Sequence, residues 1–320
     1  MTANESSSSP PIDRWPELPL ESWSDTCDTL HLWTQIVGKV ALKLRPFLNE
    51  WWQIAFQMTP RGLTTGNVPF PGGVFSFDFD FIEHSLVLSL SDGRRTRLPL
   101  APRSVASFYR EIMAVLWMHD IVVSINPQPV EIPGAIRCDE DELHAAYDPE
   151  AVRRWWQIML STERVLQRYR SQFVGKSSPT QFFWGSFDLN QTRFSGRPAP
   201  EPVGAPRFMR LAEDQENAAC GFWPGNVNMG GVTLGEPAFY AYIYPEPEGY
   251  RQSPMRPEAA YFNEQLGEFI LPYDAVQRSS DPEQTLLEFF QSTYEAAVRF
   301  ALWDRAALER PSRKGSNGHG

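Results

Sequence analysis

A strict alternation of phenylalanine with polar residues constrains the fold of this chain more than any other feature. Val74 to Phe81 carries phenylalanine at every second position, with serine or aspartate between them. Leu86 to Leu90 alternates in the same way, Asp92-Gly93 is a strong hairpin signal, and Thr96 to Leu100 predicts the return strand. Because successive side chains of a strand point to opposite faces, these segments predict an antiparallel sheet with one apolar face.

Long helices flank the predicted strands. Apolar residues recur at helical spacing from Thr26 to Leu44 and from Pro102 to Met118, and Pro46 ends the first of these helices. Two further helices are predicted, from Glu150 to Phe173 and from Asp281-Pro282 to Leu308. The remaining predicted strands are Trp51 to Met58, Ile121 to Ile125, Gln181 to Leu189, Ala218 to Pro224, Ala238 to Tyr244 and Leu266 to Leu271.

The two halves of the chain repeat one order of elements. The first half has a helix with Val37-Gly-Lys39, an aromatic strand and a turn with Arg61, and the second has Val174-Gly-Lys176, an aromatic strand and a turn with Arg193. Each half closes with a helix. We therefore predict an α+β fold of two pseudo-repeated antiparallel sheet-and-helix halves, α-β-β-β-α twice, in one compact unit. Coincidence among common residue types is the alternative.

The polar, acidic and proline-bearing segment 127–147 is expected to be a linker within a single domain, 15–309. It separates the pseudo-halves 15–126 and 148–309. Trp15 to Trp23 has two prolines between its tryptophans and is expected to be a strap that packs its indoles onto the body. Both chain ends lack apolar periodicity, so disordered tails are expected at 1–14 and 310–320.

Composition narrows the class of protein. The net charge is −10 and there is no basic run, which disfavours nucleic acid as a partner. No run approaches the roughly 20 apolar residues of a membrane helix, and Met1 to Pro11 has no apolar region typical of a signal peptide. Cys27, Cys138 and Cys220 are widely spaced with no CxxC pair, so we expect reduced thiols in a cytoplasmic protein. The oligomeric state stays open.

Three arginines carry the best signal for a binding site. Arg61, Arg193 and Arg197 each lie near glycine and threonine or serine in a predicted turn. Backbone N–H groups beside a guanidinium suit a carboxylate or phosphate, so we expect a small anionic ligand at the seam where the two halves meet. Internal ion pairs, for example with Asp188 or Glu246, are the alternative interpretation.

Other candidates have equally open interpretations. His31, Gln35 and Lys39 share one helix face, which either contacts a ligand or is solvated. Aromatic residues of the second half either line a pocket or belong to the core. The full set of ligand-binding candidates is His31, Gln35, Lys39, Thr59, Arg61, Trp184, Asp188, Thr192, Arg193, Arg197, Trp223 and Tyr242.

Common catalytic and cofactor signatures are missing from the sequence. The histidines show no HxxxH or HExxH spacing, so no metal site is predicted. There is no GxSxG elbow and no GxGxxG or GxxxxGK[ST] phosphate loop. No catalytic residue and no cofactor can therefore be assigned, and enzymatic activity stays undecided.

Several long motifs together resemble a known family. They are WPELPLESW and the helix after it (Trp15 to Val40), FFWGSFDLNQTRFSGR (Phe182 to Arg197), GFWPG (Gly221 to Gly225), FYAYIYPEP (Phe239 to Pro247) and the segment Phe290 to Arg305. This combination is similar to a bacterial family known as domain of unknown function 5996. The resemblance implies one unit of unknown activity with no catalytic residues to transfer. The family pattern has histidines where this chain has Gln181 and, nearby, Asp214-Gln215-Glu216.

Two functional hypotheses follow. The first is a small-molecule enzyme or binding protein that holds an anion at the seam between the halves. The second is a non-catalytic interaction module that uses an exposed aromatic surface, such as Trp15 to Trp23 or Tyr240 to Tyr250. A deep pocket lined by arginines and aromatic residues favours the first hypothesis, and a flat apolar patch favours the second.

Overall fold

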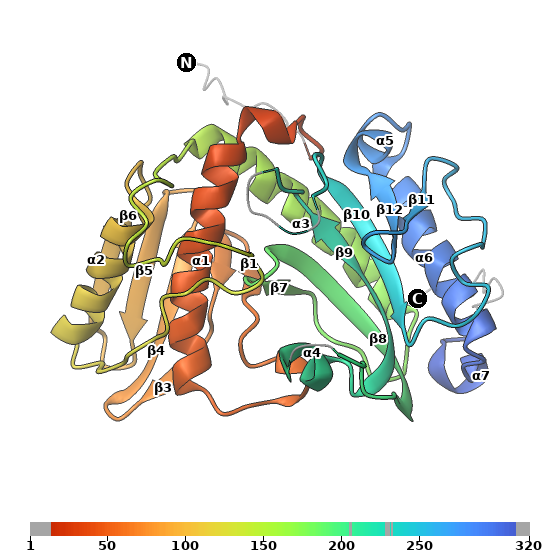
Figure 1. Ribbon diagram of the computed structural model, residues 1–320, viewed down its shortest axis with the longest axis horizontal. Helices are drawn as coiled ribbons and strands as arrows, with labels where there is room; N and C mark the ends of the chain where they lie inside the picture. Colours follow the sequence, from red (N-terminus) through yellow and green to blue (C-terminus); the bar gives the residue numbers. More distant parts are fainter. Residues whose placement is uncertain (1–13, 205–206, 228–230, 232, 312–320) are drawn as a thin grey trace, which may run out of the picture.

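Two antiparallel sheets of six strands each form the body of the protein (Figure 1). The computed structural model describes residues 14–204, 207–227, 231 and 233–311, and the side chains of Arg207 and Phe208 are not described. The first sheet has the order β1 (Gln57–Thr59), β2 (Gly62–Thr64), β4 (Gly73–Asp80), β5 (Ser85–Leu90) and β6 (Arg95–Pro99), with β3 (Val68–Phe70) paired to β4. The second has the order β11 (Tyr261–Asn263), β12 (Glu268–Pro272), β10 (Ala238–Tyr244), β9 (Gln215–Trp223), β8 (Asp188–Pro198) and β7 (Gln181–Phe183).

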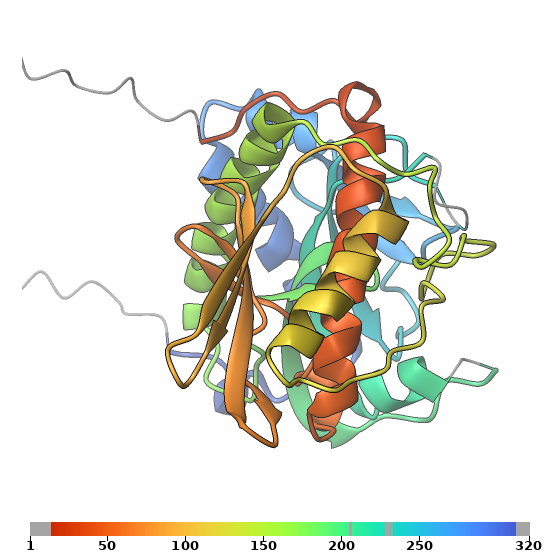
Figure 2. The ribbon, with the colours of Figure 1, turned by 90° about the vertical axis from the view of Figure 1, so that its left-hand side faces the viewer.

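Four long helices cover the sheets. Figure 2 shows the first sheet between α3 on one side and α1 and α2 on the other, and α3 and α6 pack against the back of the second sheet. Asp148, Ser104 and Asp281 cap α3, α2 and α6 by accepting hydrogen bonds from backbone N–H groups of the first turn. The helices are α1 (Ser24–Leu44), α2 (Val105–Met118), α3 (Pro149–Ser171) and α6 (Pro282–Phe300), with short α4 (Arg207–Ala212), α5 (Tyr273–Gln277), α7 (Arg305–Leu308), η1 (Leu20–Ser22) and η2 (Asn49–Trp51).

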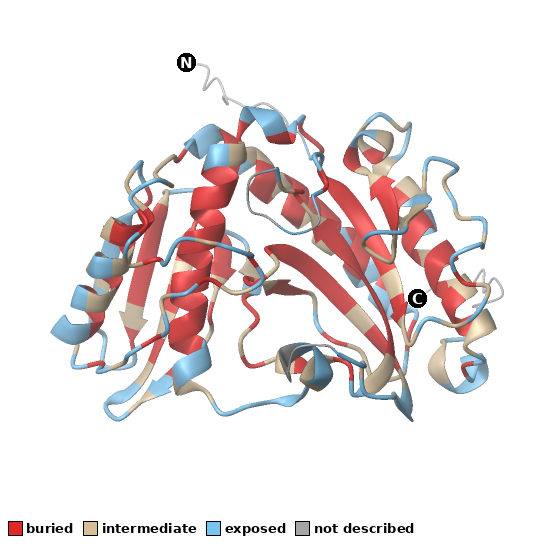
Figure 3. Cartoon of the chain, viewed as in Figure 1, coloured by how far each residue is buried: buried red, intermediate tan, exposed pale blue. Residues whose placement is uncertain are grey.

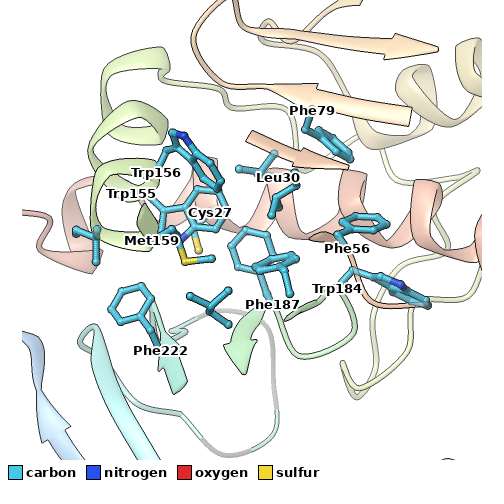
Figure 4. Packing of buried hydrophobic residues seen from close by; sticks show 14 of the residues in the cluster. Cys27, Leu30, Phe56, Phe79, Trp155, Trp156, Met159, Trp184, Phe187 and Phe222 are labelled. Atoms are coloured by element: carbon cyan, nitrogen blue, oxygen red, sulfur yellow. The ribbon is translucent and has the colours of Figure 1, made fainter. Parts of the chain in front are cut away.

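Aromatic residues fill one continuous core between the helices and the sheets (Figures 3 and 4). The Trp155 ring on α3 stacks on Phe187, with ring centroids 5.2 Å apart, and meets the edge of Phe81 at 5.5 Å. The phenylalanines of β4 are buried, which confirms the apolar face predicted from their alternation. The Trp15 and Trp23 indoles are also buried, as expected for the strap.

The two sheets are joined edge to edge. Phe56 and Phe182 exchange two backbone hydrogen bonds of 2.9 Å, which link the segment before β1 to β7. The Trp184 indole lies over Gly38 in the middle of α1, where a Cβ atom would stand 2.3 Å from the ring. The same indole donates to the carbonyl of Ile54 over 3.0 Å. The halves therefore share both backbone pairing and core packing.

Several predicted elements differ from the structure. In the predicted strand Trp51 to Met58, residues 51–54 form the end of η2 and a turn, because Glu50 and Trp51 both adopt positive φ angles, and only Gln57 and Met58 belong to a strand, β1. Residues 121–125 form no strand. The predicted strand Gln181 to Leu189 is broken by a turn at residues 184–187, and β8 then runs through Thr192 and Arg193.

Both halves place their strands between long helices, so the fold is α+β with two antiparallel sheets. Each sheet has six strands rather than the predicted three, and the internal duplication stays a prediction.

Most of each predicted tail, residues 1–13 and 312–320, lies outside the described residues. Within the described ranges, no helix has the length and apolar character needed to span a bilayer.

Candidate functional site

A pocket of about 660 Å³ lies between the two halves. The concave face of the second sheet forms its floor. The first half contributes α1 and the segment around η2, and the linker contributes Val130 to Ile132. Helix α4 and the loop after β9 complete the wall. A volume of this size is typical of sites that enclose a small organic molecule.

The alternation of β8 decides which side chains reach the pocket. Asp188, Asn190 and Thr192 line it, whereas Arg193 points to the other face of the sheet. That other face packs against α3 and α6 and is part of the core. β8 thus carries polar residues on the face toward the pocket and core residues on the opposite face.

Gly221 on β9 lets Tyr240 of β10 reach β8. The two residues are register partners, and a Cβ atom at Gly221 would stand 1.8 Å from the carbonyl oxygen of Leu189 and 2.7 Å from the Tyr240 hydroxyl. With no side chain there, the tyrosine ring crosses β9 and its hydroxyl accepts a 2.9 Å hydrogen bond from Asn190 Nδ2. Position 221 therefore requires glycine, because the Leu189 carbonyl and the Tyr240 hydroxyl approach its backbone too closely for any side chain.

Asp188 is the buried carboxylate at the centre of the pocket floor. Its two oxygens accept hydrogen bonds from the Ser186 and Tyr240 hydroxyls, and the residue is only 8% exposed. Burial raises the pKa of Asp188, while the two hydroxyl donors oppose that rise. No arginine or lysine among the described residues pairs with this carboxylate.

Two further carboxylates enter the pocket without a partner. Neither Glu131, from the linker, nor Glu268, from β12, makes a hydrogen bond or ion pair through its carboxylate within the described part of the chain. Burial raises the pKa of Glu268 to about 8, and the charge of Asp188 adds to the effect. The same two causes raise the pKa of Glu131 to about 7, but this residue is exposed to solvent, so Glu268 is the more strongly perturbed of the two.

A fourth acid lies at the α4 end of the pocket. Glu213 accepts hydrogen bonds from Asn217 Nδ2 and from the Tyr242 hydroxyl. Burial raises its pKa, and these two donors partly offset the rise. The Tyr242 and Tyr240 rings stack with centroids 6.3 Å apart, so the tyrosine pair connects Glu213 with Asp188 across the floor.

Two polar atoms of the pocket lining that lack a hydrogen-bond partner are also acceptors. Gln181 is 5% exposed and its Oε1 has no hydrogen-bond partner, and Asn226 Oδ1 is likewise buried and unpartnered. Among the lining residues that the structure describes, there is no lysine or arginine. The wall therefore offers negative charge and acceptor oxygens beside the aromatic faces of Trp223 and the tyrosine pair.

The predicted polar stripe of α1 holds the linker in place. His31 lines the pocket, where its Nε2 lies 2.8 Å from the Gly185 carbonyl oxygen and its ring stacks on Phe187. Burial lowers the pKa of His31 to about 4, so the ring is neutral at pH 7. Gln35 and Lys39 bind linker backbone atoms instead of facing water. The interpretation of this stripe as a solvated face was wrong, because the linker covers it.

The structure does not bring the three predicted arginines together. Arg61 pairs with Asp80 at 2.8 Å, and Arg197 pairs with Glu216 at 2.6 Å. Both form ion pairs, although with other acids than those considered from the sequence. Arg193 is buried, with its guanidinium carbon 3.4 Å from the centre of the Tyr169 ring. None of the three lines the pocket.

The other candidates divide in the same way. Thr59 closes the β1–β2 turn by accepting from the N–H groups of Arg61 and Gly62. The predicted candidates that do line the pocket are His31, Trp184, Asp188, Thr192, Trp223 and Tyr242. Sequence reasoning missed Glu131, Glu213 and Glu268, which lie in separate acidic stretches that look solvated in the sequence.

Within the described residues, no group of three or more His, Cys, Asp or Glu side chains is arranged to hold a metal ion.

Fold and pocket together define an α+β protein built around an acidic, aromatic-lined internal site. Residues 15–310 match a family described as a family of unknown function, DUF5996. The chain belongs to that family, and the match agrees with the resemblance of its motifs. No curated protein and no solved structure matches the chain.

Proposed function

We propose that this protein binds a small organic cation in the pocket between its two halves. The observation that carries the proposal is the set of carboxylates, Glu131, Asp188 and Glu268, in a lining whose described residues include no lysine or arginine. Asp188 and Glu268 are shielded from solvent with no cationic partner among the described residues, which is costly, and such perturbed groups gather at functional sites. A bound ammonium or guanidinium group would supply the missing counter-charge.

The aromatic wall supports the same ligand class. The faces of Trp223, Tyr240 and Tyr242 border the pocket, and aromatic faces attract desolvated cations. A carboxyl group with a pKa near 7 or 8 is also matched to proton transfer at neutral pH, so the pocket suits either a binding protein or an enzyme that acts on an amine. This proposal replaces the anionic ligand expected from the arginines, since none of those side chains lines the pocket.

The interaction-module hypothesis receives no comparable support. It relied on exposed aromatic residues, but Trp15, Trp23, Tyr240 and Tyr250 are buried. For the compartment, we retain the cytoplasm as our proposal. Its support is that Cys27, Cys138 and Cys220 are all free and buried thiols.

Calorimetric titration with simple ions tests the proposal. Butylamine and tetramethylammonium should bind to the full-length protein, whereas acetate and phosphate should not. The variant Glu268→Gln should weaken amine binding by about tenfold, since a charged hydrogen bond contributes roughly 1.5–3 kcal/mol. Glu258→Gln is the matched control, because it removes the same charge from an exposed position outside the pocket. Binding of acetate or phosphate instead of the amines would overturn the proposal.

A further inference from the structure

The two unpaired carboxylates come from different walls of the pocket. Glu131 is carried by the linker, and its Oε1 would lie 2.2 Å from a Cβ atom at Gly185, so it stands directly over the turn between β7 and β8. Glu268 is on β12, and the sheet order β8-β9-β10-β12 separates it from β8 by three strand steps. At about 4.8 Å per step, β8 and β12 are therefore roughly 14 Å apart across the pocket floor.

The linker that presents Glu131 is fixed rather than loosely attached. Gln35 donates to the Val130 carbonyl over 2.9 Å and accepts from the Val130 N–H over 2.8 Å. Lys39 donates to the carbonyl of Gln128 in the linker and, over 3.0 Å, to that of Asn126 just before it. A buried helix face thus sets the position of the carboxylate, which is the kind of support a binding site requires.

Between the two carboxylates the floor stays polar and aromatic. Asp188 is close enough to repel negative charge on both Glu131 and Glu268. The stacked Tyr240 and Tyr242 rings extend along β10 beside it. A ligand that reaches from one carboxylate to the other would therefore pass over a third negative group and two aromatic faces.

An independent feature points to a hydrogen-bond donor in the same space. Gln181 lines the pocket, is 5% exposed, and its Oε1 has no partner. A buried acceptor without a donor is unfavourable, and few occur in native proteins. An N–H group of a bound ligand would satisfy it.

From this arrangement we infer that the ligand is an elongated organic cation with an amino group at each end, a linear diamine or a longer polyamine. One ammonium binds at Glu131 and the other at Glu268, and the chain between them lies over Asp188 and the tyrosine pair. The inference rests on the proposed function and specifies its ligand class. A monoamine would neutralise one carboxylate and leave the other unpaired.

Calorimetric titration with matched amines distinguishes the proposed function, binding of an organic cation, from the inference that this cation has two amino groups. Butylamine and hexylamine are compared with diaminobutane, diaminohexane and spermidine, in about 0.15 M salt to suppress weak attraction to a chain of net charge −10. The diamine or polyamine that fits the spacing should bind at least about tenfold more tightly than the monoamine of equal length. Equal affinities would overturn this inference and leave the proposed function standing. No binding by any amine would overturn both.

Single-carboxylate variants sharpen the result. Glu131→Gln and Glu268→Gln should each reduce diamine affinity about tenfold, toward that of the monoamine, and Glu258→Gln should change neither. Glutamine keeps the volume of glutamate and cannot ionise, so these variants should fold, which thermal melting verifies. If only one of the two carboxylates affects diamine binding, the two-ended ligand is excluded.

Discussion

Asp80 of the first sheet and Asp188 of the second are both 8% exposed, yet their carboxylates behave in opposite ways. Partial burial would raise the pKa of Asp80, but the Arg61 guanidinium and the N–H groups of Ile82 and Glu83 hold it below its usual value. The pKa of Asp188 is raised, since burial is opposed only by hydroxyl donors. Two carboxylates with the same exposed fraction therefore have opposite pKa shifts, because Asp188 lies deeper in the protein and lacks the guanidinium partner that Asp80 has.

The difference lies in the partner that each sheet supplies. On the first sheet, an arginine in the neighbouring turn completes the ion pair. On the second, the nearest charges that act on Glu131 and Glu268 come from another carboxylate. A pocket that holds Asp188 and Glu268 with no cation among its described lining residues offers a place for one from outside, which distinguishes it from a structural ion pair.

The largest expected effect comes from adding a side chain at Gly221, where the Tyr240 ring crosses β9. Gly221→Ala should lower the free energy of unfolding by about 4 kcal/mol, since the new Cβ would stand 1.8 Å from the Leu189 carbonyl oxygen. Urea unfolding measures it. Gly267→Ala is the control: no atom lies within 4 Å of its Cβ, so only the strain of positive φ, about 1 kcal/mol, is expected. Equal losses would mean that β9 can shift to make room.

The second effect tests the face of β8 that belongs to the core. Arg193→Ala should cost about 3 kcal/mol of stability, because it removes a buried side chain from among Tyr169, Phe173 and Tyr294. Amine affinity should not change, since the side chain lies on the face away from the pocket. Arg197→Ala, in a half-exposed ion pair, should change stability by less than about 1 kcal/mol. Lost ligand binding with unchanged melting would restore the arginine hypothesis.

The smallest effect compares Glu268 of the second sheet with Asp80 of the first by the pH dependence of the stability of their variants. The pKa of Glu268 is about 8 in the folded protein and about 4.5 when unfolded, so the folded state holds more protons between these values and stability falls as pH rises. Glu268→Gln should therefore make the protein more stable than the parent near pH 9 and hardly change its stability near pH 4. Thermal melts across this range measure the difference.

Asp80→Asn is the opposite control for that experiment. The folded-state pKa of Asp80 is lowered, so its contribution is present above about pH 4 and is lost as pH falls further. The asparagine variant should be less stable than the parent at neutral pH and approach it in acid. If both variants respond to pH in the same direction, burial alone decides the charge state and the comparison between the sheets fails.

Local sequence signals predicted much of the fold. The alternation of Val74 to Phe81, the Asp92-Gly93 hairpin and the helix from Thr26 to Leu44 are all present, because each depends on neighbouring residues. The turn at 184–187 was missed, since Trp184 and Phe187 look like strand residues but are held by the Gly38 surface and by Trp155. These contacts are distant in the chain.

The candidate site was predicted only in part. Trp184, Asp188, Trp223 and Tyr242 were identified from their aromatic and polar context. Glu131, Glu213 and Glu268 were not, because isolated acids in a polar linker, after a short helix and beyond a hairpin resemble solvated residues. The alternation of Tyr240 and Tyr242 on a strand was the available signal of a polar pocket face. The turn assigned to Arg193 was wrong because β8 continues through it.

The surface of α1 at Gly38 has a consequence for the order in which the chain is completed. During synthesis, α1 emerges long before Trp184, whose indole covers that glycine, and before Phe182, which pairs with Phe56. Until residue 184 has emerged, an apolar notch on the helix and the backbone groups of Phe56 lack their native partners. The first half therefore reaches its final packing only when the middle of the second half is available.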